Sequence, residues 1–420
     1  MKRVFALLVL VGFLSLTVSF LAPPSASAGT APTIISPATY PPFGANPYSP
    51  LVIDSAGNLY GTATTGGRHN FGTVFRLTPA ADKWVATVLY SFKGGEDGDL
   101  PYGGVILDGA GNLYGTTTSG GKPPCSCGTV FELTPSTTGA WTKTVLHRFS
   151  GGGDGGTPAA ALVFDSEGNL YGTTLNGGAF NEGTVLKLTP SSTGKWTEKI
   201  LHNFGSGVND GVNPQGSLAI DSSGNLYGTT TTGVYNAGGV AFKLSPDSIG
   251  GWKETILHPF GASGDGKGPY GGLIFDSAGN LYGTTISGGK KENAGTVFEL
   301  TPSSGVWTET VLHSFTAGTD GKSPYGNVVL DSAGSLYGTT AYGGSAGTVF
   351  KVAQSSGVWR EAVIVNFGNQ TGDNPNAGLV FDTAGNLYGT TVDGGMNGFG
   401  TVFELTVSRG RWTQKTILNF

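Results

Sequence analysis

Cysteine, charged residues and long apolar runs are all scarce in this sequence. Only 2 of the 420 residues are cysteine, and 12% are charged, with 23 basic and 28 acidic side chains that give a formal net charge of −5. Two cysteines are too few for a disulfide framework or a four-cysteine zinc site. The basic residues form no block, so the sequence lacks the clustered Lys and Arg that phosphate binding requires. We therefore expect no nucleic-acid partner.

The two cysteines, Cys125 and Cys127, stand one residue apart in "KPPCSCGTV". In an exported protein they could form a local disulfide or stay as free thiols. A metal site is the weaker alternative, because two thiolates without a nearby histidine supply half a ligand set. In each case the pair belongs to one loop and does not hold the fold together.

The long apolar run of the chain lies at its N-terminus. Lys2 and Arg3 precede the apolar segment 4–21, and an "ASA" sequence ends at Ala28. This order is typical of a secretory signal peptide over residues 1–28, with an uncleaved anchor as the alternative. No later segment approaches the roughly 18 apolar residues of a membrane span. We expect a bacterial extracytoplasmic protein, secreted or periplasmic, with no membrane span after signal removal.

Glycine and proline are abundant instead, at 73 and 22 residues, and such a composition can indicate disorder. Here, however, the glycines recur in a period, and an eleven-residue motif, "FDSAGNLYGTT" at 275–285, returns in close copies. Its tyrosine recurs every 51 to 57 residues, and all seven tryptophans recur once per period. The tyrosines are Tyr60, Tyr114, Tyr171, Tyr227, Tyr282, Tyr337 and Tyr388, and the tryptophans are Trp84, Trp141, Trp196, Trp252, Trp307, Trp359 and Trp412.

Each repeat holds four short strand patterns, a to d, which in the fifth repeat are 272–276, 280–285, 295–301 and 307–315. The links are so short that consecutive strands must pair as an antiparallel meander. Seven meanders predict an all-β fold over residues 48–420, a single seven-bladed β-propeller with four antiparallel strands per blade. A β-helix and a ring of six or eight blades are the alternatives.

Residues 29–47 form an N-terminal extension ahead of the first repeat. The stretch "PTIISPATYPPFGANPY", residues 32–48, covers most of this extension and finishes like the linkers "DGKGPY" and "DGKSPY" that precede other strand-a segments. We expect Thr33 to Ser36 to lie near the last blade and to help close the ring.

Three polar positions recur with the repeat. The aspartate of the a–b turn is predicted to cap that turn, because it lacks the further oxygen ligands that calcium requires. The histidines six residues after a tryptophan are predicted to be packing residues rather than a metal ring, because other repeats hold apolar residues there. The aspartates of the d–a linkers are predicted to form turns, with ligand or cation contact as the alternative. In this order the positions are Asp54, Asp108, Asp165, Asp221, Asp276, Asp331 and Asp382; His147, His202, His258 and His313; and Asp97, Asp154, Asp210, Asp265, Asp320 and Asp373.

Function is expected on the face of the ring that carries the b–c and d–a loops. The b–c loops differ from repeat to repeat while the a–b turns are nearly alike, and unlike loops on a uniform scaffold are where binding residues gather. The distinctive polar residues there, and the predicted ligand-binding residues, are Arg68, His69, Asn70, Lys290, Lys291 and Asn293.

The sequence shows no catalytic set, no metal site and no cofactor motif. A nucleophile needs a paired base and an orienting acid, and a glycosidase needs two inward carboxylates. The many G-x-G fragments lack the helix of a phosphate-binding motif. Calcium stays open as a cofactor, but the sequence offers no ligand set for it.

With "GNLYGTT", "GTVFELTP" and "VLHSF" recurring in this order, residues 48–420 resemble the bacterial GloVer-type (Gloeo/Verruco) tandem-repeat proteins. The resemblance implies β-propeller repeats and no established activity, so it assigns no functional residue. The a–b hairpin more weakly resembles that of NHL-type propellers, which supports the fold and not a function.

The sequence therefore favours a secreted binding or structural module, a monomer that contacts carbohydrate or protein surfaces. Its low charge and its Thr-, Ser-, Gly- and Tyr-rich loops suit such surfaces better than ionic ligands. The alternative is an enzyme, a polysaccharide-active or lactone-type hydrolase with its site at the central channel.

Overall fold

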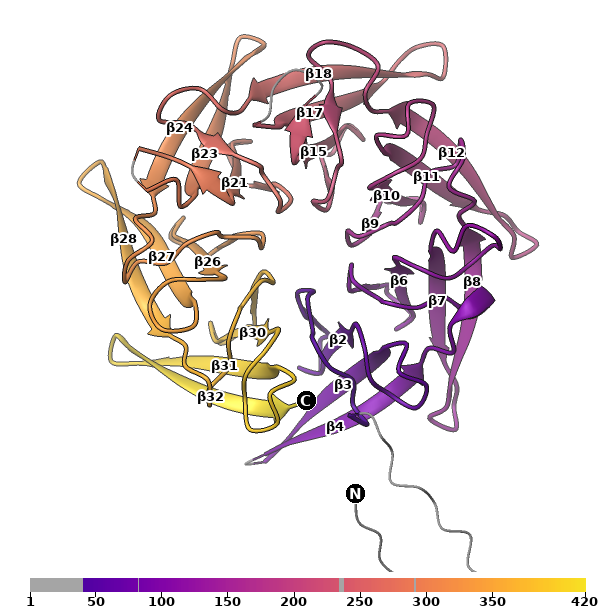
Figure 1. Ribbon diagram of the computed structural model, residues 1–420, viewed down its shortest axis with the longest axis horizontal. Coiled ribbons are helices and arrows are strands. Elements are labelled where there is room, and N and C mark those ends of the chain that lie inside the picture. Colours follow the sequence, from indigo (N-terminus) through magenta and orange to yellow (C-terminus); the bar gives the residue numbers. More distant parts are fainter. Residues whose placement is uncertain (1–40, 82, 234–237, 291) are drawn as a thin grey trace, which may run out of the picture. The chain divides into compact units, whose positions relative to one another are not determined.

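The structure of the protein is a computed structural model that describes residues 41–81, 83–233, 238–290 and 292–420. In these residues seven four-stranded antiparallel sheets stand around a central axis (Figure 1). The predicted all-β, seven-bladed propeller is confirmed, whereas the ring-closing segment predicted at Thr33 to Ser36 lies outside the described residues. The described part of the chain contains no helix of the length and apolar character that a membrane crossing requires.

Each blade uses four strands in chain order, a to d from the axis outward (Figure 1). The a strands are β1 (Val52–Ile53), β5 (Val105–Leu107), β9 (Val163–Phe164), β14 (Ala219–Ile220), β20 (Ile274–Phe275), β25 (Val329–Leu330) and β29 (Val380–Phe381). The b strands are β2 (Leu59–Ala63), β6 (Leu113–Thr117), β10 (Leu170–Thr174), β15 (Leu226–Thr230), β21 (Leu281–Thr285), β26 (Leu336–Thr340) and β30 (Leu387–Thr391).

The outer strands are longer. The c strands are β3 (Thr73–Ala80), β7 (Thr129–Pro135), β11 (Thr184–Pro190), β17 (Val240–Pro246), β23 (Thr296–Ser303), β27 (Thr348–Ser355) and β31 (Thr401–Ser408). The d strands are β4 (Lys83–Ser91), β8 (Trp141–Arg148), β12 (Trp196–Asn203), β18 (Trp252–Pro259), β24 (Val306–Ser314), β28 (Val358–Asn366) and β32 (Arg411–Asn419). One 3₁₀ turn, η1 (Gly95–Asp97), interrupts the linker between blades 1 and 2.

Strand b is buried at every position because it lies between the sheets of two neighbouring blades. Its glycine is required by close packing: a Cβ on Gly283 would lie 2.6 Å from Cζ of Phe298 on the adjacent strand c. Adding volume to such a site forces neighbouring side chains out of their preferred rotamers. The glycine of "LYGTT" is therefore fixed by packing rather than by a turn.

The hydrophobic core consists of seven clusters, each shared by two adjacent blades. Between blades 4 and 5, Phe260 and Phe298 meet with ring centroids 4.9 Å apart, and Tyr227 meets Trp307 at 6.2 Å. Aromatic contacts at such angles and distances add to the free energy gained by burial. The tryptophan that occurs once per repeat thus packs each blade against the tyrosine of the preceding one.

The ring closes by the same contacts. Phe420 meets Phe75 of blade 1 edge-on at 5.2 Å, as equivalent phenylalanines do between other blades. The backbone N–H of Asn46 donates to the carbonyl of Phe399 (2.9 Å), and its side-chain amide donates to the carbonyl of Val392 (3.2 Å). These contacts join blades 1 and 7, and each of the two blades takes all four of its strands from one continuous segment of the chain.

The aspartate of each a–b turn is held inside its own hairpin, as predicted. In blade 4, Oδ1 of Asp221 accepts from the backbone N–H groups of Ser223 and Asn225, both at 2.9 Å. Its Oδ2 accepts from the side-chain amide of Asn225 (2.7 Å) and from the hydroxyl of Tyr227 (3.0 Å). Burial opposes ionisation, but these hydrogen bonds outweigh it and hold the pKa of Asp221 below its ordinary value. The repeated motif is a self-contained turn.

Candidate ligand-binding site: the central pocket

The d–a linkers and the b–c loops lie on one face, because the start of strand a and the end of strand b adjoin in an antiparallel pair. Within each blade the linker pairs with the loop that follows it. In blade 1 the pair is Ala45 with Thr65, in blade 6 it is Lys322 with Tyr342, and in two blades the pairing extends to a short ladder. These ladders join β13 (Gly211–Val212) to β16 (Thr232–Gly233) and β19 (Gly266–Lys267) to β22 (Ser287–Gly288).

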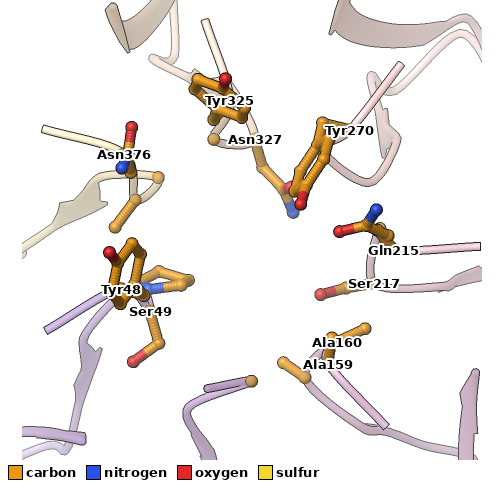
Figure 2. A pocket seen from close by; sticks show the side chains of 18 of the residues that line it. Tyr48, Ser49, Ala159, Ala160, Gln215, Ser217, Tyr270, Tyr325, Asn327 and Asn376 are labelled. Atoms are coloured by element: carbon orange, nitrogen blue, oxygen red, sulfur yellow. The ribbon is translucent and has the colours of Figure 1, made fainter. Parts of the chain in front are cut away.

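On this face, one residue from every blade reaches a pocket on the central axis. Each of these residues directly follows the proline of a d–a linker. The pocket has a volume of about 290 Å³. Figure 2 shows the side chains of these residues, other than Tyr102, around its open centre. We call this cavity the central pocket. The seven residues are Tyr48, Tyr102, Ala159, Gln215, Tyr270, Tyr325 and Asn376.

Threonines of strand b fix the backbone beneath these side chains. The hydroxyl of Thr229 donates to the carbonyl of Gly271 in the next blade (2.9 Å), and that of Thr284 donates to Gly326 (3.1 Å). Successive linkers approach so closely that a Cβ on Gly326 would lie 2.5 Å from the carbonyl carbon of Ala377. The wall of the central pocket is therefore rigid main chain that carries adjustable side chains at its rim.

The tyrosines of the rim are half-buried and contact one another. Tyr48 and Tyr102 stack with centroids 4.6 Å apart and planes 21° apart, while Tyr270 and Tyr325 meet edge-on at 5.1 Å. Burial raises the pKa of Tyr102 above its ordinary value, and the neighbouring phenols add to this effect. The phenols stay neutral, so each can donate and accept a hydrogen bond.

Amide side chains supply the other polar groups of the central pocket. Oδ1 of Asn327 accepts from the backbone N–H of Gly272 (2.6 Å), which leaves its amino group for other partners. Oδ1 of Asn376 is buried and has no hydrogen-bond partner among the described residues. A buried acceptor without a partner costs free energy, and a ligand hydroxyl would satisfy it.

The central pocket combines aromatic, amide and hydroxyl groups. Ser49, Ser217 and the b–c loop residue Tyr342 complete its polar lining, and the remaining positions are small or apolar. Among the described residues that line it, none is Asp, Glu, His, Lys, Arg or Cys. Such a lining can stack on and hydrogen-bond to a neutral ligand, while its serines have no adjacent base.

The structure places the predicted binding residues elsewhere. Arg68, His69 and Asn70 are exposed on the b–c loop of blade 1, and Lys290 and Asn293 are exposed on that of blade 5. None of these five lines the central pocket. Blades 1 and 5 are not neighbours in the ring, so the two groups are not brought together (Figure 1).

Two of these residues have a role within their own loops. Oδ1 of Asn70 accepts from the backbone N–H of Gly66 (3.0 Å), and Oδ1 of Asn293 accepts from that of Gly288 (2.7 Å). Both asparagines have a positive φ, which asparagine tolerates better than most residues. The sixth predicted residue, Lys291, lies outside the described residues. A role for the six in binding stays a prediction.

The residues of the central pocket were missed although a sequence signal for them exists. The proline of the d–a linker recurs in every repeat, but the next residue varies among tyrosine, alanine, glutamine and asparagine. A variable residue after a recurring proline indicates a position where the backbone is fixed by its neighbours and the side chain is not needed for the fold. Variation in the longer b–c loops is more conspicuous than variation at this single position.

The cysteine pair is a local feature, as expected. Cys125 and Cys127 are joined by a disulfide within the b–c loop of blade 2. The bridge spans one intervening residue and connects no two blades.

Comparison with known families identifies the repeat. The family model described as the Gloeobacter/Verrucomicrobia repeat matches residues 25–234, 125–309 and 217–420. The chain belongs to this family. Matches to the Gloeobacter/Verrucomicrobia repeat overlap and together cover all seven blades, which confirms the resemblance found from the motifs.

Solved structures resemble this member of the repeat family in fold. The periplasmic gluconolactonase PpgL of Pseudomonas aeruginosa is 16% identical with a TM-score of 0.54, over 86% of this chain and 95% of that one. PorZ of Porphyromonas gingivalis, a surface component of the type-IX secretion system, is 13% identical with a TM-score of 0.46, over 88% and 47%. At 16% identity the likeness to PpgL shows the fold alone. None of the curated proteins compared with the chain matches it.

Proposed function

We propose that this propeller is a binding module for a neutral carbohydrate, held over the central pocket. The observation that carries the proposal is the rim itself: four half-buried tyrosines and two amides, at equivalent positions of the ring, around an opening without charged side chains. The faces of tyrosine rings pack against the C–H faces of sugars, and their hydroxyls hydrogen-bond to sugar hydroxyls. The volume of about 290 Å³ suits a small ligand or one end of a longer chain.

A hydrolase acting at the same place is the alternative, and the fold likeness to a gluconolactonase is the reason to test it. Lactone hydrolysis needs an activated nucleophile or water, and glycoside hydrolysis needs two carboxylates. The hydroxyls of Ser49 and Ser217 line the central pocket, and that lining contains no histidine, carboxylate or lysine to act as their base. Binding therefore fits these groups better than hydrolysis.

We also propose a location and an oligomeric state for this module. The signal-like residues 1–28 support an extracytoplasmic location, secreted or periplasmic. Blades 1 and 7 bury their apolar side chains against each other and close the ring, which supports a monomer.

A glycan array followed by calorimetry tests the proposal. The mature chain would be screened with and without calcium, and the best neutral glycan titrated against wild type and Tyr102→Ala. Because stacking on Tyr48 and contact with the ligand are both lost, we expect affinity to fall at least tenfold, about 1.4 kcal/mol.

Arg68→Ala, on an exposed loop outside the central pocket, is the matched control and should bind like wild type. Equal loss in both variants, or no glycan bound at all, would contradict the proposal. So would turnover of a lactone or polysaccharide that Ser49→Ala or Ser217→Ala abolishes, since that result would assign the pocket to a hydrolase.

A further inference from the structure

The outer edges of the blades bring together residues that stand apart in the repeat. At four successive blade interfaces, the histidine of strand d, the aspartate of the following linker and a glutamate on strand d of the next blade adjoin. The glutamate stands two residues after the tryptophan. The four sets are His147, Asp154 and Glu198; His202, Asp210 and Glu254; His258, Asp265 and Glu309; and His313, Asp320 and Glu361.

The set between blades 3 and 4 has a compact geometry. Nε2 of His202 lies 3.4 Å from Oδ1 of Asp210 and 3.7 Å from Oε1 of Glu254. The other oxygen of the Asp210 carboxylate, Oδ2, accepts from the backbone N–H and the hydroxyl of Ser206 at 2.7 and 2.8 Å. Asp210 is 5% exposed, and these bonds fix its orientation with Oδ1 toward the histidine.

The set between blades 4 and 5 repeats this arrangement. Nε2 of His258 lies 3.0 Å from Oδ2 of Asp265, and backbone N–H groups of Gly261 and Gly266 hold that carboxylate. One donor atom from each of His258, Asp265 and Glu309 lies within 4.8 Å of the others, as in the preceding set. Both sets take two ligands from one side of a blade interface and the third from the other side.

Neither of these two sets contains a lysine or an arginine. Oε1 of Glu254 and Oε1 of Glu309 are buried and have no hydrogen-bond partner among the described residues. No lysine or arginine in the described part of the chain forms an ion pair with either glutamate.

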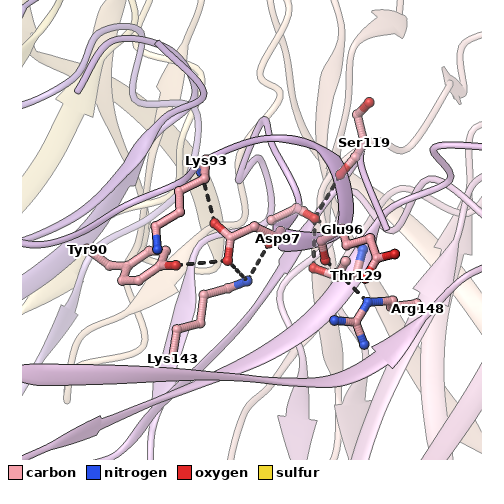
Figure 3. Close-up of polar contacts among 9 residues, drawn as sticks. Tyr90, Lys93, Glu96, Asp97, Ser119, Thr129, Lys143 and Arg148 are labelled. Carbon is pink, nitrogen blue, oxygen red and sulfur yellow. Dashed lines mark hydrogen bonds and ion pairs between the residues drawn. The ribbon is translucent and has the colours of Figure 1, made fainter. Parts of the chain in front are cut away.

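The interface between blades 1 and 2 shows what fills this position when the ligands differ. There the histidine is replaced by Tyr90 and the glutamate by Lys143, and the ammonium of Lys143 contacts Asp97 at 3.1 Å (Figure 3). The lysine side chain is 2% exposed, and Tyr90 donates to the same carboxylate at 2.8 Å. The scaffold therefore accommodates a buried cation here.

We propose that His202, Asp210 and Glu254, and likewise His258, Asp265 and Glu309, bind divalent transition-metal ions of the zinc class. Bonds of 2.0–2.2 Å in a tetrahedral site separate the ligand atoms by roughly 3.3 Å, close to the distances around His202. One imidazole and two carboxylates leave a fourth position to water. Calcium fits less well, because it takes six to eight oxygen ligands.

Such ions would link neighbouring blades at the outer edge of the ring. The ligands of each ion come from two blades, so an ion that binds the folded ring and not the unfolded chain stabilises the ring by mass action. These sites are separate from the central pocket, because none of their six ligand residues lines it.

The test uses the mature chain, purified without a histidine tag and stripped with a chelator. Zinc chloride is titrated by calorimetry into wild type and into Glu254→Gln/Glu309→Gln, with thermal unfolding followed in parallel. We expect micromolar or tighter binding by wild type, a thermal midpoint higher by roughly 3–6 °C in zinc, and at least tenfold weaker binding by the double variant. Each single variant should lose one zinc ion per chain.

Glu299→Gln is the matched control, since Glu299 lies on strand c of blade 5 and accepts from Tyr282 at 2.8 Å. Glu254→Lys/Glu309→Lys supplies an ammonium in the manner of Lys143, and it should fold without responding to zinc. Absence of zinc binding by wild type, or binding that survives unchanged in both double variants, would overturn the proposal.

Discussion

The two ends of a blade are built from the same repeat but treat variation in opposite ways. At the a–b end, the aspartate of nearly every blade makes the same four hydrogen bonds, as Asp54 and Asp221 do. At the d–a end, the residue after the linker proline changes from Tyr102 to Ala159 to Gln215. The hydrogen bonds of the a–b end recur from blade to blade, whereas the residue at the d–a end changes.

The difference follows from where each side chain finds its partners. The Asp221 carboxylate is satisfied inside its own hairpin, so every copy of the hairpin needs the same residues. The side chain of Ala159 faces an open pocket, while the hydroxyl of Thr116 in the preceding blade donates to the carbonyl of the next residue, Ala160 (3.3 Å), and holds the backbone. Residues that recur in every blade therefore belong to the scaffold. Positions where the backbone recurs but the side chain varies are the candidates for ligand binding.

The largest effect should come from breaking the repeated end. Asp221→Ala removes the partners of two backbone N–H groups, of Asn225 and of the buried Tyr227 hydroxyl, and we expect a loss of about 3 kcal/mol in the free energy of unfolding. Asp247, in the c–d turn of the same blade, caps only exposed N–H groups, so Asp247→Ala should cost about 1 kcal/mol. Urea denaturation measures both, and equal losses would refute the distinction.

A smaller effect is expected in acid. Hydrogen bonds lower the pKa of five turn aspartates in spite of their burial, namely Asp54, Asp165, Asp221, Asp276 and Asp331. A carboxyl whose pKa is lower in the folded state stabilises that state above its ordinary pKa of 3.8, and this contribution is lost as pH falls through the folded value. Stability should therefore decline below about pH 4. In Asp221→Asn the decline should be shallower, and an identical pH profile would show that Asp221 titrates normally.

The smallest effect should come from changing the variable end. Ala159→Tyr places a fifth tyrosine on the rim, and we expect carbohydrate affinity to change severalfold, on the order of 1 kcal/mol. The free energy of unfolding should change by less than about 0.5 kcal/mol, as for other surface substitutions. Ala333→Tyr, on an exposed a–b turn, is the control and should leave affinity unchanged. A large loss of stability in Ala159→Tyr would mean that the rim belongs to the scaffold.

Most of the fold could be predicted from the sequence because each blade is specified locally. Four strand patterns, a capped turn and one tryptophan recur at nearly fixed spacing, so seven copies predict seven blades. The turn role of Asp221 followed from residue type and neighbours alone. The packing role predicted for His258 is incomplete. The centroid of its ring lies 4.7 Å from that of Phe260, but its Nε2 also contacts Asp265.

The candidate sites could not be predicted in the same way, because they depend on residues from different blades. Tyr48 and Tyr102 stack across a blade interface, and Glu254 reaches the histidine of the preceding blade. Each of these residues looks like ordinary surface within its own repeat. Searching for unusual loops led instead to Arg68 and Lys290, which lie on separate blades.

The sequence by itself determined the blade: its strands, its turn and the aromatic residues that its neighbours must cover. Only the tertiary structure decided which side chains meet when seven blades close into a ring. The physical reason is range: turn capping and strand pairing act within one repeat, whereas the central pocket and the His–Asp–Glu sets exist only where successive repeats touch.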